Sequence, residues 1–318
     1  MKKYVLCFLL SLCIFSLGCG AEKTEKAAGS GQAKDMQEIS LGLMPDIDSL
    51  PFIVAQEKGF FAEEGIKVNL QQFKSAMDRD SAMQSGNLDG AVSDLLAVAF
   101  AKEGGFDVKV TSFTDGSYKL VAGAGENAVD INGLQGKDVA VSKNTIIEYV
   151  ADQILHRAQM QGDDVNKVVI PQIPVRLEML QNGKLAAAVL PEPMAGIALH
   201  HGGHLISSSD QLGINPGVMM FATKSLEGKK KEIQALYRAY NKAVVYLNDT
   251  KPEEYMPMVL DKGGFPPAAK DSLQLPHYRT AGRPAAKDID DCMAWLKEKN
   301  LIQKVYTSED LVVSVLEQ

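Results

Sequence analysis

The stretch GKDVAVSKNTIIEYVADQIL, residues 136–155, decides the fold class because it reads as a strand, a short loop and a helix. Its first seven residues form a short apolar run, which is typical of a strand. Thr145 and Glu148 follow with the T-x-x-E spacing of a capping box, in which each side chain bonds the amide of the other residue. Apolar residues then recur at helical spacing at Ile147, Val150, Ala151, Ile154, Leu155 and Ala158. The stretch therefore predicts one strand–helix unit of an α/β sheet, with a helix start at the edge where such sheets bind ligands.

The same alternation of strand and helix patterns extends from residue 39 to residue 223. Strands are predicted at 39–45, 66–73, 88–94, 107–113, 118–124, 136–142, 167–173, 186–190 and 218–223, and helices at 76–85, 95–102, 174–182 and 194–201. After Thr223 the alternation stops, and helical patterns follow at 229–248, 252–260, 286–299 and 308–316. This order predicts α/β lobes that carry a helical C-terminal covering.

The first twenty residues, MKKYVLCFLLSLCIFSLGCG, have two lysines and then an apolar segment too short for a membrane span, as secretory signals do. They resemble a bacterial lipoprotein signal, in which a cysteine after a small residue receives the lipid. We therefore expect a signal peptide at 1–18, a lipid on Cys19 and a flexible tether over 19–37. The folded body would be extracytoplasmic and anchored to the cell membrane. It would keep only Cys292, and so would depend on its core rather than on disulfides.

Composition and motifs argue against several classes of function. The formal net charge is −7, and loss of the two signal lysines makes the remaining body more acidic, which disfavours nucleic acid as a partner. Serine-hydrolase, zinc-protease and phosphate-loop motifs are missing, so we expect neither an enzyme nor a cofactor. His200, His201 and His204 are the one metal-like cluster. Neighbouring histidines on a helix point apart, so we expect no metal, although the sequence leaves that possibility open.

Four motifs carry a family resemblance. They are PDIDSLPFIVAQEKGFFAEEGIKVNL (45–70), GNLDGAVSD (86–94), GLQGKDVAVSKNT (133–145) and LQNGKLAAAVLPEP (180–193). Together they resemble solute-binding proteins of bacterial ABC importers, in the group that takes nitrate, sulfonates, taurine and thiamine precursors. The chain departs from that group at Lys184-Leu185-Ala186, where an aspartate commonly precedes the alanine.

The resemblance implies a type II-like periplasmic-binding-protein fold, in which two α/β lobes joined by two crossovers close on a small molecule without reaction. It places lobe one at 38–115 and 223–318 and lobe two at 116–222. It also implies a membrane permease with its ATPase as partners, and a monomeric binding protein. A sensor lipoprotein, or an enzyme of the same fold that acts on a small heterocycle, remains an alternative.

The resemblance also brings candidate ligand-binding residues to the cleft from loops of both lobes. They are Met44, Asp46, Asp48, Ser49, Ser93, Asp94, Ser117, Asn144, Thr145, Arg176 and Glu192. Several of them have a plain structural alternative. Ser49 and Asp94 could only cap helices, Glu192 could only begin one, and Arg176 could be a surface charge or pair with Glu192.

The same residues leave two ligand hypotheses open. If the carboxylates of Asp46, Asp94 or Glu192 enter the cleft, they require donors, which favours an amine or an aminopyrimidine such as a thiamine precursor. If Arg176 and the amides at Thr145 dominate, the ligand is a sulfonate, a carboxylate or nitrate. We expect a small organic nutrient that contains nitrogen or sulfur.

Overall fold

The computed structural model describes residues 36–125 and 130–316. The predicted signal peptide, Cys19 and nearly all of the tether lie outside these residues. Within the described residues, no helix combines the length and the apolar character that crossing a bilayer requires.

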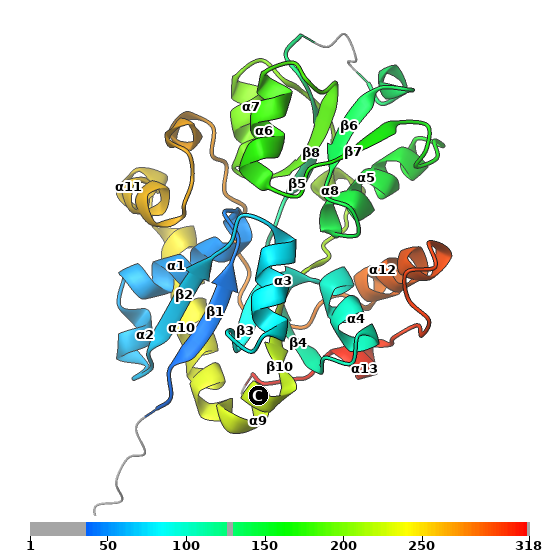
Figure 1. The fold of residues 1–318 in the computed structure, drawn as a ribbon. Helices are drawn as coiled ribbons and strands as arrows, with labels where there is room; N and C mark the ends of the chain where they lie inside the picture. Colours follow the sequence, from blue (N-terminus) through cyan, green and yellow to red (C-terminus); the bar gives the residue numbers. More distant parts are fainter. Residues whose placement is uncertain (1–35, 126–129, 317–318) are drawn as a thin grey trace, which may run out of the picture. The chain divides into compact units, whose positions relative to one another are not determined.

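Two five-stranded sheets organise the described residues (Figure 1). The first has the order β2 (Val68–Gln72), β1 (Ile39–Leu43), β3 (Gly90–Asp94), β10 (Gly217–Ala222) and β4 (Val108–Phe113). The second has the order β7 (Asn166–Val169), β6 (Asp138–Val141), β8 (Ala187–Pro191), β5 (Tyr118–Ala122) and β9 (His204–Ser208). Each sheet contains one strand that is antiparallel to both of its neighbours, β10 in the first and β5 in the second. The predicted two-lobed α/β fold class is confirmed.

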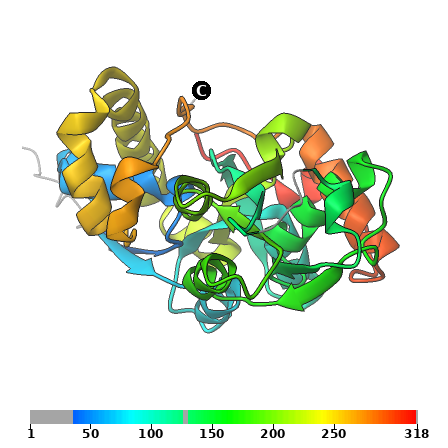
Figure 2. The ribbon, with the colours of Figure 1, turned by 90° about the horizontal axis from the view of Figure 1, so that it is seen from above.

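Helices cover both sheets, and most of the C-terminal ones belong to the first lobe (Figures 1 and 2). The first lobe carries α1 (Leu50–Glu57), α2 (Phe60–Glu63), α3 (Ala76–Gln84), α4 (Leu95–Glu103), α9 (Thr223–Gly228), α10 (Lys230–Asp249), α11 (Pro252–Lys262), α12 (Ala286–Glu298) and α13 (Ser308–Leu311). The second carries α5 (Ile146–Arg157), α6 (Ile173–Gln181), α7 (Met194–His200) and α8 (Ser209–Leu212). The 20-residue α10 packs on α1 and α2 through an apolar stripe, and α12 packs on α4. The predicted helical segment on lobe one is therefore confirmed.

Three differences from the sequence-based prediction concern the pairing of strands. Residues 217–222, which we expected at the end of lobe two, pair with β3 and β4, so the chain has already returned to the first sheet. The helix expected at 308–316 ends at Leu311, because Val312 and Val313 join the edge of β4 instead. We expected no strand at β9, because HLISS shows no clear alternation of apolar and polar residues.

Candidate functional site

A small cavity of about 40 Å³ lies between the two lobes. It is lined by Met44, Asp46, Ala76, Arg79, Val92, Ser93, Asp94, Tyr118, Ser142, Thr145, Ile146, Ile147, Pro171, Ile173, Arg176 and Pro191. Two backbone hydrogen bonds cross between the lobes beside it: the Ile173 amide donates to the Lys74 carbonyl, and the Ile47 amide to the Glu192 carbonyl, both at 3.2 Å. The cavity has room for about three water-sized groups. The two interlobe hydrogen bonds mark the arrangement as a closed one.

Arg176 is the most unusual residue of the cavity because it is a fully buried cation without a carboxylate partner among the described residues. It lies in the first turn of α6 with 0% of its surface exposed. Its Nε donates to the Val189 carbonyl at 3.0 Å and its Nη1 to the Ile170 carbonyl at 2.8 Å, whereas Nη2 is buried without a hydrogen-bond partner among the described residues. Burial lowers the pKa of Arg176 to about 9. Both structural alternatives for Arg176 are wrong, since it is not at the surface and Glu192 pairs with Lys119 instead.

Arg79 is a second buried arginine of the cavity, and the sequence analysis missed it. Its Nη1 donates to the Val92 carbonyl at 3.1 Å, and its Nη2 lies 2.8 Å from Asp80 Oδ1 and 3.8 Å from Asp94 Oδ2. Burial opposes its charge, but these carboxylates outweigh that effect and raise the pKa of Arg79. The signal was its position on predicted helix 76–85, three residues after Ala76 and therefore on the same face.

Two carboxylates of the cavity wall already have local partners. Asp94 accepts from the Ala97 amide at 2.9 Å, so it caps α4 while also facing Arg79. Asp46 accepts from the Ser49 hydroxyl at 3.1 Å, and Ser49 in turn accepts from the Met44 amide. Burial raises the pKa of both carboxyls, and the nearby Asp48 raises that of Asp46 further. Ser49 therefore organises the loop around Asp46 and makes no side-chain cap on α1.

The structure brings six of the eleven predicted residues to the cavity wall and places the other five around it. Those on the wall are Met44, Asp46, Ser93, Asp94, Thr145 and Arg176, and the others are Asp48, Ser49, Ser117, Asn144 and Glu192. Ser93 is buried and its hydroxyl has no partner among the described residues. Glu192 accepts from the Gly196 amide at 3.0 Å, so it does begin α7, as its structural alternative predicted. Ser117 bonds Asp210 at a crossover.

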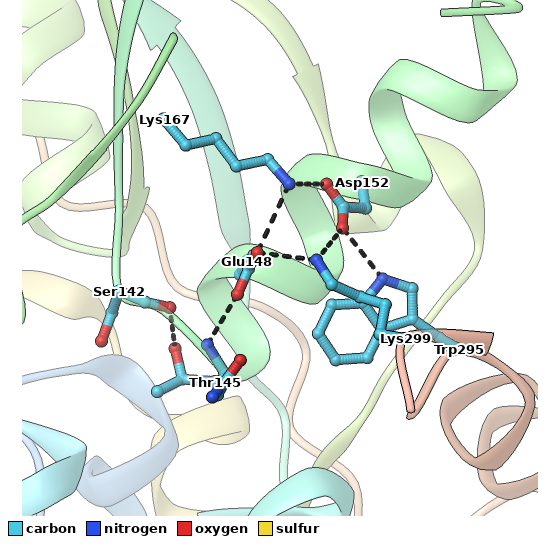
Figure 3. A network of polar contacts seen from close by, with 8 residues as sticks. Ser142, Thr145, Glu148, Asp152, Lys167, Trp295 and Lys299 are labelled. Carbon is cyan, nitrogen blue, oxygen red and sulfur yellow. Dashed lines mark hydrogen bonds and ion pairs between the residues drawn. The ribbon is translucent and has the colours of Figure 1, made fainter. Parts of the chain in front are cut away.

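The side chains of Thr145 and Glu148 hold the loop before α5 (Figure 3). Each bonds an amide one residue before the one that the predicted capping box would use. The Thr145 hydroxyl accepts from the Ile147 amide at 3.2 Å and donates to the Ser142 carbonyl at 2.8 Å. Glu148 Oε2 accepts from the Asn144 amide at 2.6 Å rather than from that of Thr145. Asn144 has a φ of 57°, and this left-handed turn brings its amide within reach of Glu148.

Replacement of Thr145 by alanine removes both hydroxyl bonds of this loop. Because loss of an N-cap typically costs about 1 kcal/mol, we expect the free energy of unfolding to fall by about that amount. Urea denaturation of Thr145→Ala and of wild type would measure the difference. An unchanged midpoint would show that the loop does not depend on this hydroxyl.

The three histidines singled out in the sequence are not gathered into one group in the described residues. The His200 and His201 rings lie 5.8 Å apart between centroids, and His201 Nδ1 lies 2.8 Å from the Ile197 carbonyl oxygen. His204 is at the beginning of β9. Among residues 36–125 and 130–316, no group of three or more potential metal ligands comes together.

Comparison with solved structures finds the same fold in binding proteins at low sequence identity. The ligand-binding component of an ABC-type import system from Staphylococcus aureus, with zinc bound, superposes with a TM-score of 0.76 at 14% identity, covering 88% of this chain and 97% of that one. The alkanesulfonate-binding protein SsuA from Xanthomonas axonopodis pv. citri, bound to MOPS, gives 0.74 at 15% identity, covering 90% and 99%. The aliphatic sulphonate binding protein SsuA from Escherichia coli gives 0.72 at 15% identity, covering 87% and 92%.

At the level of sequence, no curated protein matches the chain. A family model described as NMT1/THI5 like matches residues 46–254, which include both sheets apart from β1 and every cavity residue except Met44. Because the match extends over more than half of the sequence, the chain belongs to the NMT1/THI5-like family.

Proposed function

We propose that the protein is the solute-binding lipoprotein of an ABC importer, and that it closes on a small molecule that presents one oxyanion group. The observation that carries this proposal is the unpartnered Nη2 of Arg176, which is buried in the wall of the interlobe cavity. A buried cation without a partner is costly, and an oxyanion that accepts from it would relieve that cost.

The charges of the cavity wall support a ligand with a single negative charge. Burial favours the protonated, neutral form of Asp46, and Asp94 faces Arg79. Neither Asp46 nor Asp94 then neutralises the charge of Arg176. The start of α5 at Ile146 lines the cavity, and the positive end of its helix dipole favours an anion there.

These features favour the anion hypothesis over the amine hypothesis. An ammonium or an aminopyrimidine would take charged acceptors from Asp46 or Asp94. Burial favours the neutral form of Asp46, and Asp94 already faces Arg79 and caps α4. The similarity to two sulfonate-binding proteins points in the same direction. The cavity volume of about 40 Å³ favours a compact head group such as a short sulfonate, a carboxylate or nitrate.

The remaining parts of the proposal concern location and partners. A lipid on Cys19 would hold the body at the outer face of the cell membrane, where a permease and its ATPase would receive the ligand from a monomeric binding protein. We propose binding without chemistry, because the cavity polar groups suit recognition. The thiol of Cys292 is buried and burial raises its pKa well above the usual range, which suits packing rather than nucleophilic attack.

A thermal-shift panel on the purified full chain tests the proposal. It sets methanesulfonate, taurine, nitrate and acetate against simple amines and an aminopyrimidine. A ligand at 100 times its dissociation constant stabilises the folded state by about 2.7 kcal/mol, roughly 5–10 °C for a protein of this size. A shift with at least one oxyanion supports the proposal, and a shift with amines or pyrimidines alone overturns it.

Ser93 provides a second test of the same cavity, because its hydroxyl has no partner within residues 36–125 and 130–316. Ser93→Ala should leave the melting temperature of the ligand-free protein nearly unchanged, since it removes no hydrogen bond. It should weaken binding of the oxyanion found by the panel about tenfold, the usual loss for one hydrogen bond to a charged group. Isothermal titration calorimetry would measure this change, and equal affinities of variant and wild type would remove Ser93 from the site.

A further inference from the structure

The C-terminal helix α12 contacts both lobes, although it belongs to the first. Its buried residues Ile289, Met293 and Leu296 share one apolar cluster with β4 and β10, and the helix packs on α4. At its C-terminal end, Trp295 and Lys299 reach α5 of the second lobe (Figures 1 and 3). The contact therefore joins the two lobes at a point away from the crossovers.

Two side chains at the C-terminal end of α12, Trp295 and the C-cap residue Lys299, bond to acidic residues of α5. Trp295 Nε1 donates to Asp152 Oδ2 at 3.0 Å, and its ring packs edge-on against Tyr149 with centroids 5.7 Å apart. Lys299 Nζ donates to Glu148 Oε1 at 2.7 Å and to Asp152 Oδ2 at 3.0 Å. The same ammonium lies 4.7 Å from the centre of the Trp295 ring. Trp295 and Lys299 thus act together on the first two turns of α5.

Glu148 links this contact to the ligand cavity. One of its oxygens accepts from Lys299, and the other accepts from the amide of Asn144, directly before the cavity residue Thr145 (Figure 3). Lys167 of β7 also contacts Glu148 and Asp152, but it belongs to the second lobe and so cannot tie one lobe to the other. Lys299 is the cation of this network that comes from the first lobe.

We propose that Trp295 and Lys299 form a closure latch, which holds α5 to the first lobe in the closed arrangement and positions the loop at residues 142–147 against the ligand. The inference rests on the proposed function, since it assigns Lys299 a positioning role for that ligand. Helix α5 moves with the second sheet, and α12 moves with the first. When the lobes rotate apart about the crossovers, the start of α5 leaves the cavity. The same rotation separates Glu148 from Lys299. Partly exposed ion pairs shift an equilibrium only about two- to fivefold each, so the latch favours closure and still permits release.

Hydrogen exchange measured by mass spectrometry on the ligand-free full chain tests the latch. The reporter is the Ile173 amide, which bonds the Lys74 carbonyl across the lobes, together with residues 142–150. Lys299→Gln should accelerate exchange in both segments about two- to fivefold, and Lys299→Arg should restore most of the protection. Lys287→Gln is the matched control, because Lys287 is exposed on the same helix and pairs there with Asp291.

The outcomes separate the latch from the proposed function. If the hydrogen-exchange rates of Ile173 and residues 142–150 are the same in Lys299→Gln as in Lys287→Gln, the latch is overturned. This result does not depend on what the protein binds. Acceleration over the whole chain, with a lower melting temperature, would show a merely structural role and would also overturn it.

A second readout uses wild type alone, because Trp295 is the single tryptophan of the sequence. Saturating methanesulfonate should reduce quenching of its fluorescence by acrylamide, since closure would bury the ring at the contact. Binding of methanesulfonate without any change in quenching would contradict the latch, whereas absence of binding would concern only the proposed ligand.

Discussion

Arg176→Met is expected to weaken binding of the oxyanion on the order of 100-fold while leaving the ligand-free protein folded. The loss is large because removal of a buried charged partner leaves the bound anion without its counter-ion. The folded state should tolerate the change, since removing a buried charge that has no carboxylate partner among the described residues offsets the loss of the hydrogen bonds to the Val189 and Ile170 carbonyls. We expect the melting temperature of the ligand-free variant to remain within roughly 3 °C of wild type. Calorimetric titration and a melting curve measure the two effects separately.

Two further variants make the result specific. Arg157→Met removes an exposed arginine from α5 in the same lobe and should bind as wild type does. Arg176→Lys keeps the positive charge but loses the planar guanidinium, which reaches both the backbone carbonyls and the cavity. Its affinity for the oxyanion should therefore lie between those of wild type and Arg176→Met. Wild-type affinity in Arg176→Met would exclude Arg176 as the anion partner.

Asp48→Asn is expected to stabilise the protein by about 3 kcal/mol at pH 7.5 and by almost nothing at pH 4. Asp48 lies buried between the crossovers, where it accepts from the Tyr118 hydroxyl at 3.0 Å, and a Cβ on Gly116 would come within 2.2 Å of it. Burial is the main reason that the pKa of Asp48 is raised from 3.8 to about 6. The hydrogen bond from the Tyr118 hydroxyl opposes the rise, and the Asp115 carboxylate adds to it.

The direction of the pH effect follows from that pKa. Between pH 3.8 and about 6 the folded protein keeps a proton on Asp48 that the unfolded chain has released. The free energy of unfolding is therefore highest below pH 4, and it falls as the pH rises through 6. Asparagine stays neutral and removes this fall. The neighbouring Asp46, whose pKa is also raised, adds a fall of the same sign in both proteins.

Urea denaturation at several pH values would test this prediction, with Asp163→Asn as a control for the loss of one exposed negative charge. Stability curves of wild type and Asp48→Asn that run parallel from pH 4 to pH 7.5 would contradict the raised pKa of Asp48. A lower free energy of unfolding for Asp48→Asn than for wild type at both pH 4 and pH 7.5 would show that the carboxylate itself is required at the crossover.

The fold could be predicted from the sequence wherever the local pattern agrees with the tertiary environment. The strand and helix at 136–155 are such a case, since an apolar run, a polar loop and an amphipathic helix follow each other without conflict. The prediction failed at 308–316 and at β9, where pairing with a neighbouring strand decides the conformation and local pattern says little. It also misplaced the second crossover, because the pattern of β10 does not show which sheet it joins.

The candidate site could be predicted only in part, because a loop position indicates closeness to the cleft but not the direction of a side chain. Arg176 lies on the wall as expected. Glu192 directly follows β8, yet its carboxylate bonds Lys119 and the Gly196 amide of α7 instead. Arg79 was missed because it lies inside a helix, where a single charged residue usually faces solvent. Which carboxylates remain available depends on hydrogen bonds that no spacing reveals.

The most direct test of an oxyanion held by Arg176 is a crystal structure of the protein with the sulfonate that gives the largest thermal shift. We predict a sulfonate oxygen about 2.8 Å from Arg176 Nη2, the usual length of such a charged hydrogen bond, and a second oxygen within reach of the Ser93 hydroxyl. A ligand that instead places a nitrogen donor on Asp46 or Asp94, with its sulfonate away from Arg176, would contradict this assignment.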